Sequence, residues 1–280
     1  MTDNRPIGVF DSGIGGLTVL REIWNAVPEE STVYFGDNSR TPYGTKSRST
    51  VIRYSLQNMK FLESKDVKMI VIACNTASAY AYEELKTRSK VPVVEVVTPG
   101  ADEACRATKN GRIGIIATKG TVSTGVYKKA VEDRAEERGM KNIEIFQQAC
   151  PLFVSLAEEG WWDNEIAKLT AEEYLKPLKE AGVDTLVMAC THYPLLSKVI
   201  GEVMGDGVTL VNTGVATAKV VRDILNKESI ASEESSSKPL REFYTSDEPE
   251  LFEQVAMPFL GEGLPSGTKH FSTDRYEVTI

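Results

Sequence analysis

Short apolar runs alternate with longer amphipathic stretches along most of this chain. Runs of strand character lie at residues 7–10, 32–35, 69–73, 92–97, 112–118, 143–146, 185–189 and 208–211. Between them, apolar positions at helical spacing predict one helix that ends near Leu20 and others over about 47–64, 76–88, 102–109, 122–138 and 195–204. More than one helix is predicted over about 153–181. This alternation predicts an α/β fold of mainly parallel sheets with helices on both faces.

The two halves of the chain share a pattern. The strand at 7–11 resembles the strand at 113–117, and each precedes a later apolar strand that ends in Ala-Cys, at Cys74 and Cys190. This order indicates an ancient duplication, although convergent strand patterning is an alternative. We expect two similar lobes, residues 1–98 plus 210–280 and residues 99–209.

The region after the last of these strands differs in character. Residues 226–240 are polar and serine-rich, which predicts an exposed loop. The strand and helix patterns that follow, with a helix start near Ser246–Pro249, are expected to pack back on the first lobe.

Composition narrows the classes of function. The N-terminus has no secretion-signal pattern, and no apolar run reaches about 18 residues, so we expect a cytoplasmic protein without a membrane segment. The formal net charge of −8 disfavours nucleic-acid binding through phosphate neutralisation. Four cysteines without a CxxC pair indicate reduced thiols, and two histidines make a His-rich metal site implausible; cysteine and carboxylate ligands for a metal stay open.

The two matched cysteines are the main candidates for chemistry. A cysteine after an apolar strand is commonly a small buried hydrophobic residue, but two with matched polar flanks favour a functional role. Cys74 is followed by Asn75 and Thr76, and Cys190 by Thr191 and His192. The start of a helix should lower the pKa of each thiol, and His192 could exchange a proton with Cys190. Cys105 and Cys150 lack such flanks and are interpreted as structural.

Two turns are weaker candidates for parts of a functional site. Residues 11–16 place Asp11, Ser12 and a glycine-rich turn between a strand and a helix, where backbone N–H groups can meet an anion. Thr18 stands where a dinucleotide fingerprint needs its third glycine. The turn at 41–44, with Tyr43 and Gly44, is by itself ordinary chain punctuation, and Thr118 and Thr121 are ordinary cap residues that could donate to a carboxylate.

Taken together, the motifs resemble the glutamate racemases of the aspartate/glutamate racemase family nearly from end to end. The matching segments are GVFDSGIGGLTVLR, TPYG, ACNTAS, VPVVEVVTPGA, IGIIAT, CPLFV and CTHYPLL. Two departures are Ala189, where members often have glycine, and Ser155, where proline is common; neither touches the expected chemistry.

The resemblance implies a site in the cleft between the lobes and a reaction without cofactor or metal. Cys74 and Cys190 would face the substrate α-carbon from opposite sides, the first taking the proton of D-glutamate and the second that of L-glutamate. The resemblance places Asp11, Ser12, Tyr43, Gly44, Asn75, Thr76, Thr191 and His192 around the substrate. Asp11 would assist Cys74, and His192 with Glu158 would assist Cys190. It also implies a homodimer.

Elementary chemistry agrees with this reading. Inversion through a planar carbanion needs a base on one face and an acid on the other, which a thiolate and a thiol supply. The motifs hold no lysine or arginine beside the cysteines, and we hypothesise that a fixed cation would hinder the exchange of roles. Racemisation of aspartate or another amino acid is an alternative, as is a two-lobed amino-acid binding or regulatory protein without catalysis.

Overall fold

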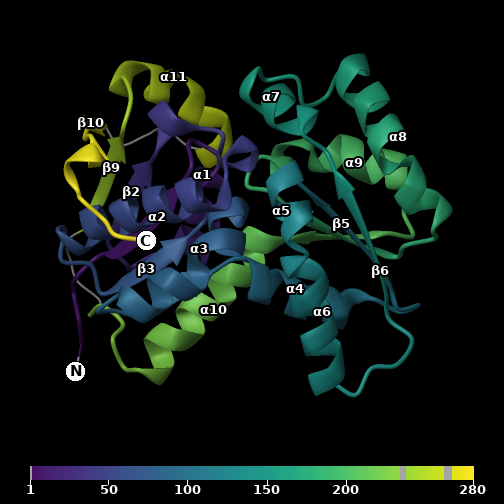
Figure 1. The fold of residues 1–280 in the computed structure, drawn as a ribbon, viewed down its shortest axis with the longest axis horizontal. Helices are drawn as coiled ribbons and strands as arrows, with labels where there is room; N and C mark the ends of the chain where they lie inside the picture. Colours follow the sequence, from purple (N-terminus) through teal and green to yellow (C-terminus); the bar gives the residue numbers. More distant parts are fainter. Residues whose placement is uncertain (1, 234–237, 262–266) are drawn as a thin grey trace.

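The computed structural model describes residues 2–233, 238–261 and 267–280 and contains two parallel sheets (Figure 1). The first sheet has the strand order β10-β9-β2-β1-β3-β4 and the second the order β6-β5-β7-β8. The first sheet consists of β1 (Ile7–Asp11), β2 (Thr32–Gly36), β3 (Met69–Ile72), β4 (Val93–Glu95), β9 (Arg241–Thr245) and β10 (Lys269–His270). The second consists of β5 (Arg112–Ala117), β6 (Glu144–Ala149), β7 (Thr185–Ala189) and β8 (Thr209–Asn212).

The two sheets repeat one topology. The order β2-β1-β3-β4 of the first matches β6-β5-β7-β8 of the second, and β1 pairs in parallel with β2 and β3 as β5 does with β6 and β7. Cys74 follows β3, and Cys190 follows the equivalent strand β7. The α/β prediction of two similar, mainly parallel lobes is confirmed, and the repeated strand order supports the inferred duplication.

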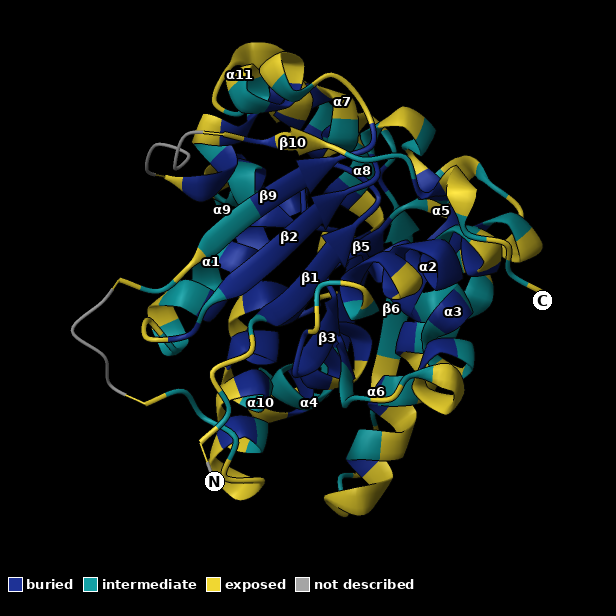
Figure 2. Ribbon diagram, turned by 90° about the vertical axis from the view of Figure 1, so that its left-hand side faces the viewer, coloured by how far each residue is buried: buried dark blue, intermediate teal, exposed yellow. Residues whose placement is uncertain are grey.

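Helices cover both faces of each sheet because each central strand sends alternate side chains to opposite faces. Figure 2 shows the central strands β1, β2 and β3 of the first sheet as buried. In β1, Ile7 and Val9 pack in one core and Phe10 in the other. The first sheet lies between α1 (Leu17–Ala26), α10 (Thr213–Lys227) and α11 (Pro249–Leu260) on one face and α2 (Arg48–Glu63) and α3 (Asn75–Arg88) on the other. The second lies between α4 (Val97–Ala107) and α6 (Val126–Glu137) on one face and α7 (Leu152–Glu158), α8 (Glu165–Glu180) and α9 (Ser197–Met204) on the other.

Some predicted helix boundaries are wrong, for local reasons. Helix α4 begins at Val97 instead of near residue 102, because the Glu95 carboxylate accepts from the backbone N–H groups of Val97 and Thr98 and caps the helix. The helix predicted over 122–138 is two helices, α5 (Lys119–Thr124) and α6, which meet at Gly125 with φ +66°.

The region after residue 208 also differs from the prediction. Strand β8 pairs with β7, so residues 210–212 lie in the second sheet and not in the first lobe as expected. Helix α10 was missed, and it contains the first two residues of the loop predicted over 226–240. Residues 234–237 of that loop lie outside the described residues.

The chain end returns to the first lobe as predicted. Strand β9 pairs in parallel with β2, and α11 packs against α1. Within the described ranges, no helix combines the length and the apolar character that a membrane span requires.

Candidate active site

Cys74 and Cys190 line one small cavity, although they come from different sheets. Both thiols are free and buried, with 5% and 6% of their residue surfaces exposed. The space open to the centre of a water molecule is about 30 Å³. The lining consists of Ser12, Thr41, Pro42, Tyr43, Gly44, Cys74, Asn75, Thr76, Thr118, Val154, Cys190, Thr191 and His192.

Cys74 is the N-cap residue of α3. Its Sγ accepts from the backbone N–H of Ala77 at 3.4 Å and donates to Ser12 Oγ at 3.6 Å. Burial, with the nearby Asp11 carboxylate, raises the pKa of the thiol to about 12, and the hydrogen bonds with Ala77 and Ser12 offset only part of this rise. The expected lowering by the helix start is therefore wrong for Cys74, because desolvation outweighs the helix N–H groups.

Asp11 lies at the end of β1, fully buried. Burial raises its pKa to about 6, against the opposing effects of the His192 charge and of the Gly16 and Gly13 N–H groups. The Gly13 N–H donates to Oδ2 at 3.1 Å, so the glycine-rich turn serves this carboxylate of the protein itself. Oδ1 has no hydrogen-bond partner among the described residues. An unpartnered buried oxygen of this kind is an acceptor ready for a proton or an ammonium group.

Cys190 has a different environment. Its Sγ lies 3.9 Å from Nδ1 of His192, whose Nε2 lies 2.9 Å from Oε1 of Glu158. Burial alone would lower the pKa of His192, but the hydrogen bonds to Cys190 and Glu158 outweigh it and raise the pKa to about 10. The imidazole is therefore protonated at neutral pH and donates from both nitrogens.

The charge on His192 concerns the hypothesis that a fixed cation beside the cysteines would hinder the exchange of roles between the two thiols. In the described part of the chain, neither lysine nor arginine lines the cavity, but protonated His192 places a positive charge beside Cys190. The two thiols are therefore not electrically equivalent. Their scaffolds differ as well, since Cys190 is followed by a short 3₁₀ turn, η3 (Tyr193–Leu196), before α9 begins.

Polar groups from both lobes meet on one side of the cavity. The hydroxyl of Thr76 lies 3.0 Å from that of Thr118 and 3.2 Å from that of Thr121. Asn75 Oδ1 accepts from the phenol of buried Tyr127, which fixes the orientation of the amide, while Nδ2 is buried without a partner in the described residues. These donors form a suitable surface for a carboxylate.

Most of the sequence-predicted residues meet at the cavity. Asp11 lies behind the wall, near Cys74, and Glu158 lies outside, in an adjoining groove beside Asp247 and Glu248 at the start of α11, from which it reaches His192. The other predicted residues belong to the lining given above.

Sequence reasoning did not assign Thr41, Pro42 or Val154 to the site, and it treated Thr118 only as a cap residue that could donate to a carboxylate. Pro42 follows Thr41 through a cis peptide bond and belongs to the TPYG motif already noted. The repeated topology carried a signal for Thr118, because it follows β5 as Ser12 follows β1. Val154 lies in α7, and no pattern in the sequence pointed to it.

Cysteine, histidine and carboxylate groups were also inspected as metal ligands. Among the residues that the structure describes, no group of three or more His, Cys, Asp or Glu side chains is placed to hold a metal ion.

Comparison with known proteins identifies the class to which this fold and site belong. Residues 7–221 match the family described as Asp/Glu/Hydantoin racemase. The chain belongs to that family, as its motifs predicted.

Individual relatives within this family have more specific names. The glutamate racemase of Geobacter metallireducens is 51% identical over 92% of this chain and 93% of its own. The glutamate racemase of Francisella tularensis, solved in complex with D-glutamate, superposes with a TM-score of 0.89 at 36% identity over 98% of this chain and 100% of its own. An aspartate racemase from Picrophilus torridus reaches a TM-score of only 0.54 at 18% identity, over 81% of this chain and 96% of its own, and shares the fold alone.

Proposed function

We propose that this protein interconverts L- and D-glutamate with Cys74 and Cys190 as the two acid–base groups. The observation that carries the proposal is that two free, buried thiols from two matched sheets line one cavity. The named glutamate racemases, at 51% and 36% identity over nearly the whole chain, support glutamate over aspartate.

The chemistry balances with these two groups. One thiolate takes the α-proton, the Cα–H bond breaks as an S–H bond forms, and the other thiol then donates its proton to the opposite face of the carbanion. Turnover in the reverse direction exchanges the roles. Burial and the Asp11 carboxylate raise the pKa of Cys74 to about 12, so Cys74 is the proton donor, and the protonated imidazole of His192 lies beside Cys190. A proton donor at Cys74 fits the conversion of L- to D-glutamate.

The neighbouring groups complete the proposal. Asp11 exchanges a proton with Cys74, and His192, held by Glu158, does so with Cys190. Ser12, Tyr43, Gly44, Asn75, Thr76, Thr118 and Thr191 bind the substrate. The cavity has space for only one or two water molecules, so an amino acid can enter only if lining groups move apart. The D-glutamate product would serve peptidoglycan synthesis in the cytoplasm, and a homodimer is the expected assembly.

Incubation with L-glutamate in deuterium oxide tests the proposal. We expect optical activity to decay while deuterium enters the α-carbon. Cys74→Ala and Cys190→Ala should each abolish racemisation. Cys105→Ala is the matched control, because Cys105 is a buried free thiol in the separate core between the second sheet and helices α4 and α6.

Other outcomes distinguish the alternatives. Heat of binding without deuterium exchange would identify a binding protein. Faster turnover of L-aspartate than of L-glutamate would overturn the substrate assignment, since one methylene in a pocket is worth about 10–200-fold in discrimination. Racemisation by Cys190→Ala at the wild-type rate would refute the mechanism.

A further inference from the structure

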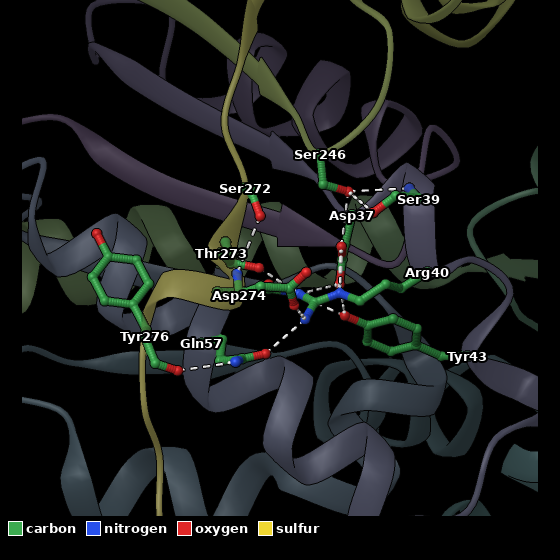
Figure 3. Close-up of polar contacts among 11 residues, drawn as sticks. Asp37, Ser39, Arg40, Tyr43, Gln57, Ser246, Ser272, Thr273, Asp274 and Tyr276 are labelled. Atoms are coloured by element: carbon green, nitrogen blue, oxygen red, sulfur yellow. Dashed lines mark hydrogen bonds and ion pairs between the residues drawn. The ribbon is translucent and has the colours of Figure 1, made fainter.

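The guanidinium of Arg40 connects the loop at the cavity with two other parts of the first lobe (Figure 3). Its side chain is 11% exposed and lies 4.1 Å from the centre of the Tyr54 ring. Its N–H groups donate to Asp37 (2.9 Å), Gln57 (2.6 Å), Asn58 (3.2 Å), Thr273 (2.5 Å) and Asp274 (3.2 Å). A planar fork with five donors suits such convergence.

Asp37 links Arg40 to Tyr43, which lines the cavity. Its carboxylate is fully buried and accepts from Arg40, from the Tyr43 phenol and, at 2.9 Å, from Ser246. Asn58 donates to the same phenol oxygen at 3.1 Å. Because Tyr43 lines the cavity, the carboxylate shared between it and Arg40 sets the position of the loop at 41–44.

The chain end reaches Arg40 as a strap, defined here as residues 268–280. Phe271 packs on Phe61 of α2 with ring centres 4.4 Å apart. The backbone carbonyls of Tyr276 and Glu277 accept from Gln57 at 2.9 Å and Lys60 at 2.5 Å. Figure 3 shows Thr273 and Asp274 of the strap beside Arg40. The strap therefore packs on α2 and supplies two of the groups that accept hydrogen bonds from Arg40.

The other side of the loop touches the second lobe. A Cβ atom placed on Gly44 would lie 2.8 Å from Cβ of Thr118, and one on Gly120 would lie 2.9 Å from the Gly44 carbonyl oxygen. The loop thus lies between the Arg40 network and the second lobe, and all four of its residues line the cavity.

We propose that Arg40 is a positioning residue that couples the C-terminal strap to the substrate-binding loop at 41–44, acting through Asp37 and Tyr43. The inference rests on the proposed function, because the loop matters only if the cavity binds the substrate. A purely structural arginine would stabilise the fold without changing the affinity of the cavity.

Steady-state kinetics in both directions separate these two roles. For Arg40→Ala we expect KM for L- and D-glutamate to rise about tenfold or more, with a smaller change in kcat, since a misplaced loop weakens binding. Arg40→Lys should not restore KM, because one ammonium cannot replace the five-donor fork. Arg53→Ala is the matched control: Arg53 also lies over the Tyr54 ring, at 5.3 Å, but is exposed and forms none of these bonds.

If Arg40→Ala does not fold, a milder variant tests the same coupling. Thr273→Val preserves the shape of a buried side chain and removes its bond to Arg40, and should raise KM several-fold with a smaller loss of melting temperature than Arg40→Ala. Lower kcat at wild-type KM in both variants would indicate only a reduced folded fraction and would overturn the inference. If the wild-type protein exchanges no α-deuterium, the proposed function fails instead, and calorimetric Kd values for glutamate then make the same comparison.

Discussion

Cys190 and His192 form a hydrogen-bonded pair, with Sγ 3.9 Å from Nδ1, whereas Cys74 lies near the carboxylate of Asp11. The lobes thus present one thiol beside a cation and one beside an anion. The two thiols therefore lie in electrostatically different surroundings, although they follow equivalent strands.

Removing the imidazole should impair the reaction in both directions. For His192→Asn we expect kcat/KM to fall about 10²–10⁴-fold, the usual contribution of a positioned acid–base group. The loss must be equal for L- and D-glutamate, because the equilibrium constant of racemisation is one. Circular dichroism from each enantiomer measures it, and His270→Asn, at the exposed second histidine, is the control. Wild-type kinetics for His192→Asn would exclude a role for the imidazole.

The pH profile should be broad, with limbs set by Asp11 and His192. We expect kcat/KM to fall below pH about 6 as Asp11 takes up a proton, and above pH about 10 as His192 loses one. Glu158→Gln removes a partner of the imidazolium and should move the alkaline limb down by about one unit, leaving the acid limb in place. An unchanged alkaline limb would show that another group controls it.

The ionised carboxylate of Asp11 should lower the free energy of unfolding of the protein. Its folded pKa, about 6, lies above the ordinary value of 3.8, so the native state binds the proton more tightly and the free energy of unfolding falls as pH rises from about 4 to 6. At one pKa unit per 1.36 kcal/mol, the penalty above this window is on the order of 3 kcal/mol. Asp11→Asn should therefore unfold at higher urea than wild type at pH 8, with a smaller difference at pH 4.5, and lose activity. A variant less stable than wild type at pH 8 would contradict this account.

Gly15 provides a steric test of the contact between the lobes. A Cβ atom there would lie 2.4 Å from Thr191 Oγ1 and 2.6 Å from His192 Cε1. Gly15→Ala should displace both side chains, lower kcat/KM more than tenfold and cost about 1–3 kcal/mol of stability. Gly207→Ala is the control, because nothing lies within 4 Å of the position of its Cβ. Full activity of Gly15→Ala would show that the lobes separate enough to accommodate the methyl group.

Several features of the fold could be read from local patterns, and others could not. The strand before each cysteine was predictable because buried parallel strands are continuous apolar runs. The start of α4 was misplaced because a carboxylate two residues upstream caps it, and the helix over 122–138 was not divided because one glycine adopts a left-handed conformation. The first depends on the contact of one side chain with the backbone, and the second on the backbone conformation of one residue.

The candidate site, like the fold, could be predicted only in part from local sequence patterns. The motifs predicted Cys74, Cys190 and most of the lining, and the repeated topology would have added Thr118. The Arg40 network escaped notice because it joins residues more than 230 positions apart in the chain, such as Arg40 and Thr273.

The sequence by itself determined the alternation of strands and helices, the two cysteines at equivalent strand ends and the family to which the chain belongs. Only the tertiary structure brought both thiols to one cavity, set Glu158 against His192 and placed Asp11 near Cys74. The physical reason is that a pKa depends on excluded water and on charges a few ångströms away, and these neighbours come from segments that meet only when the chain has folded.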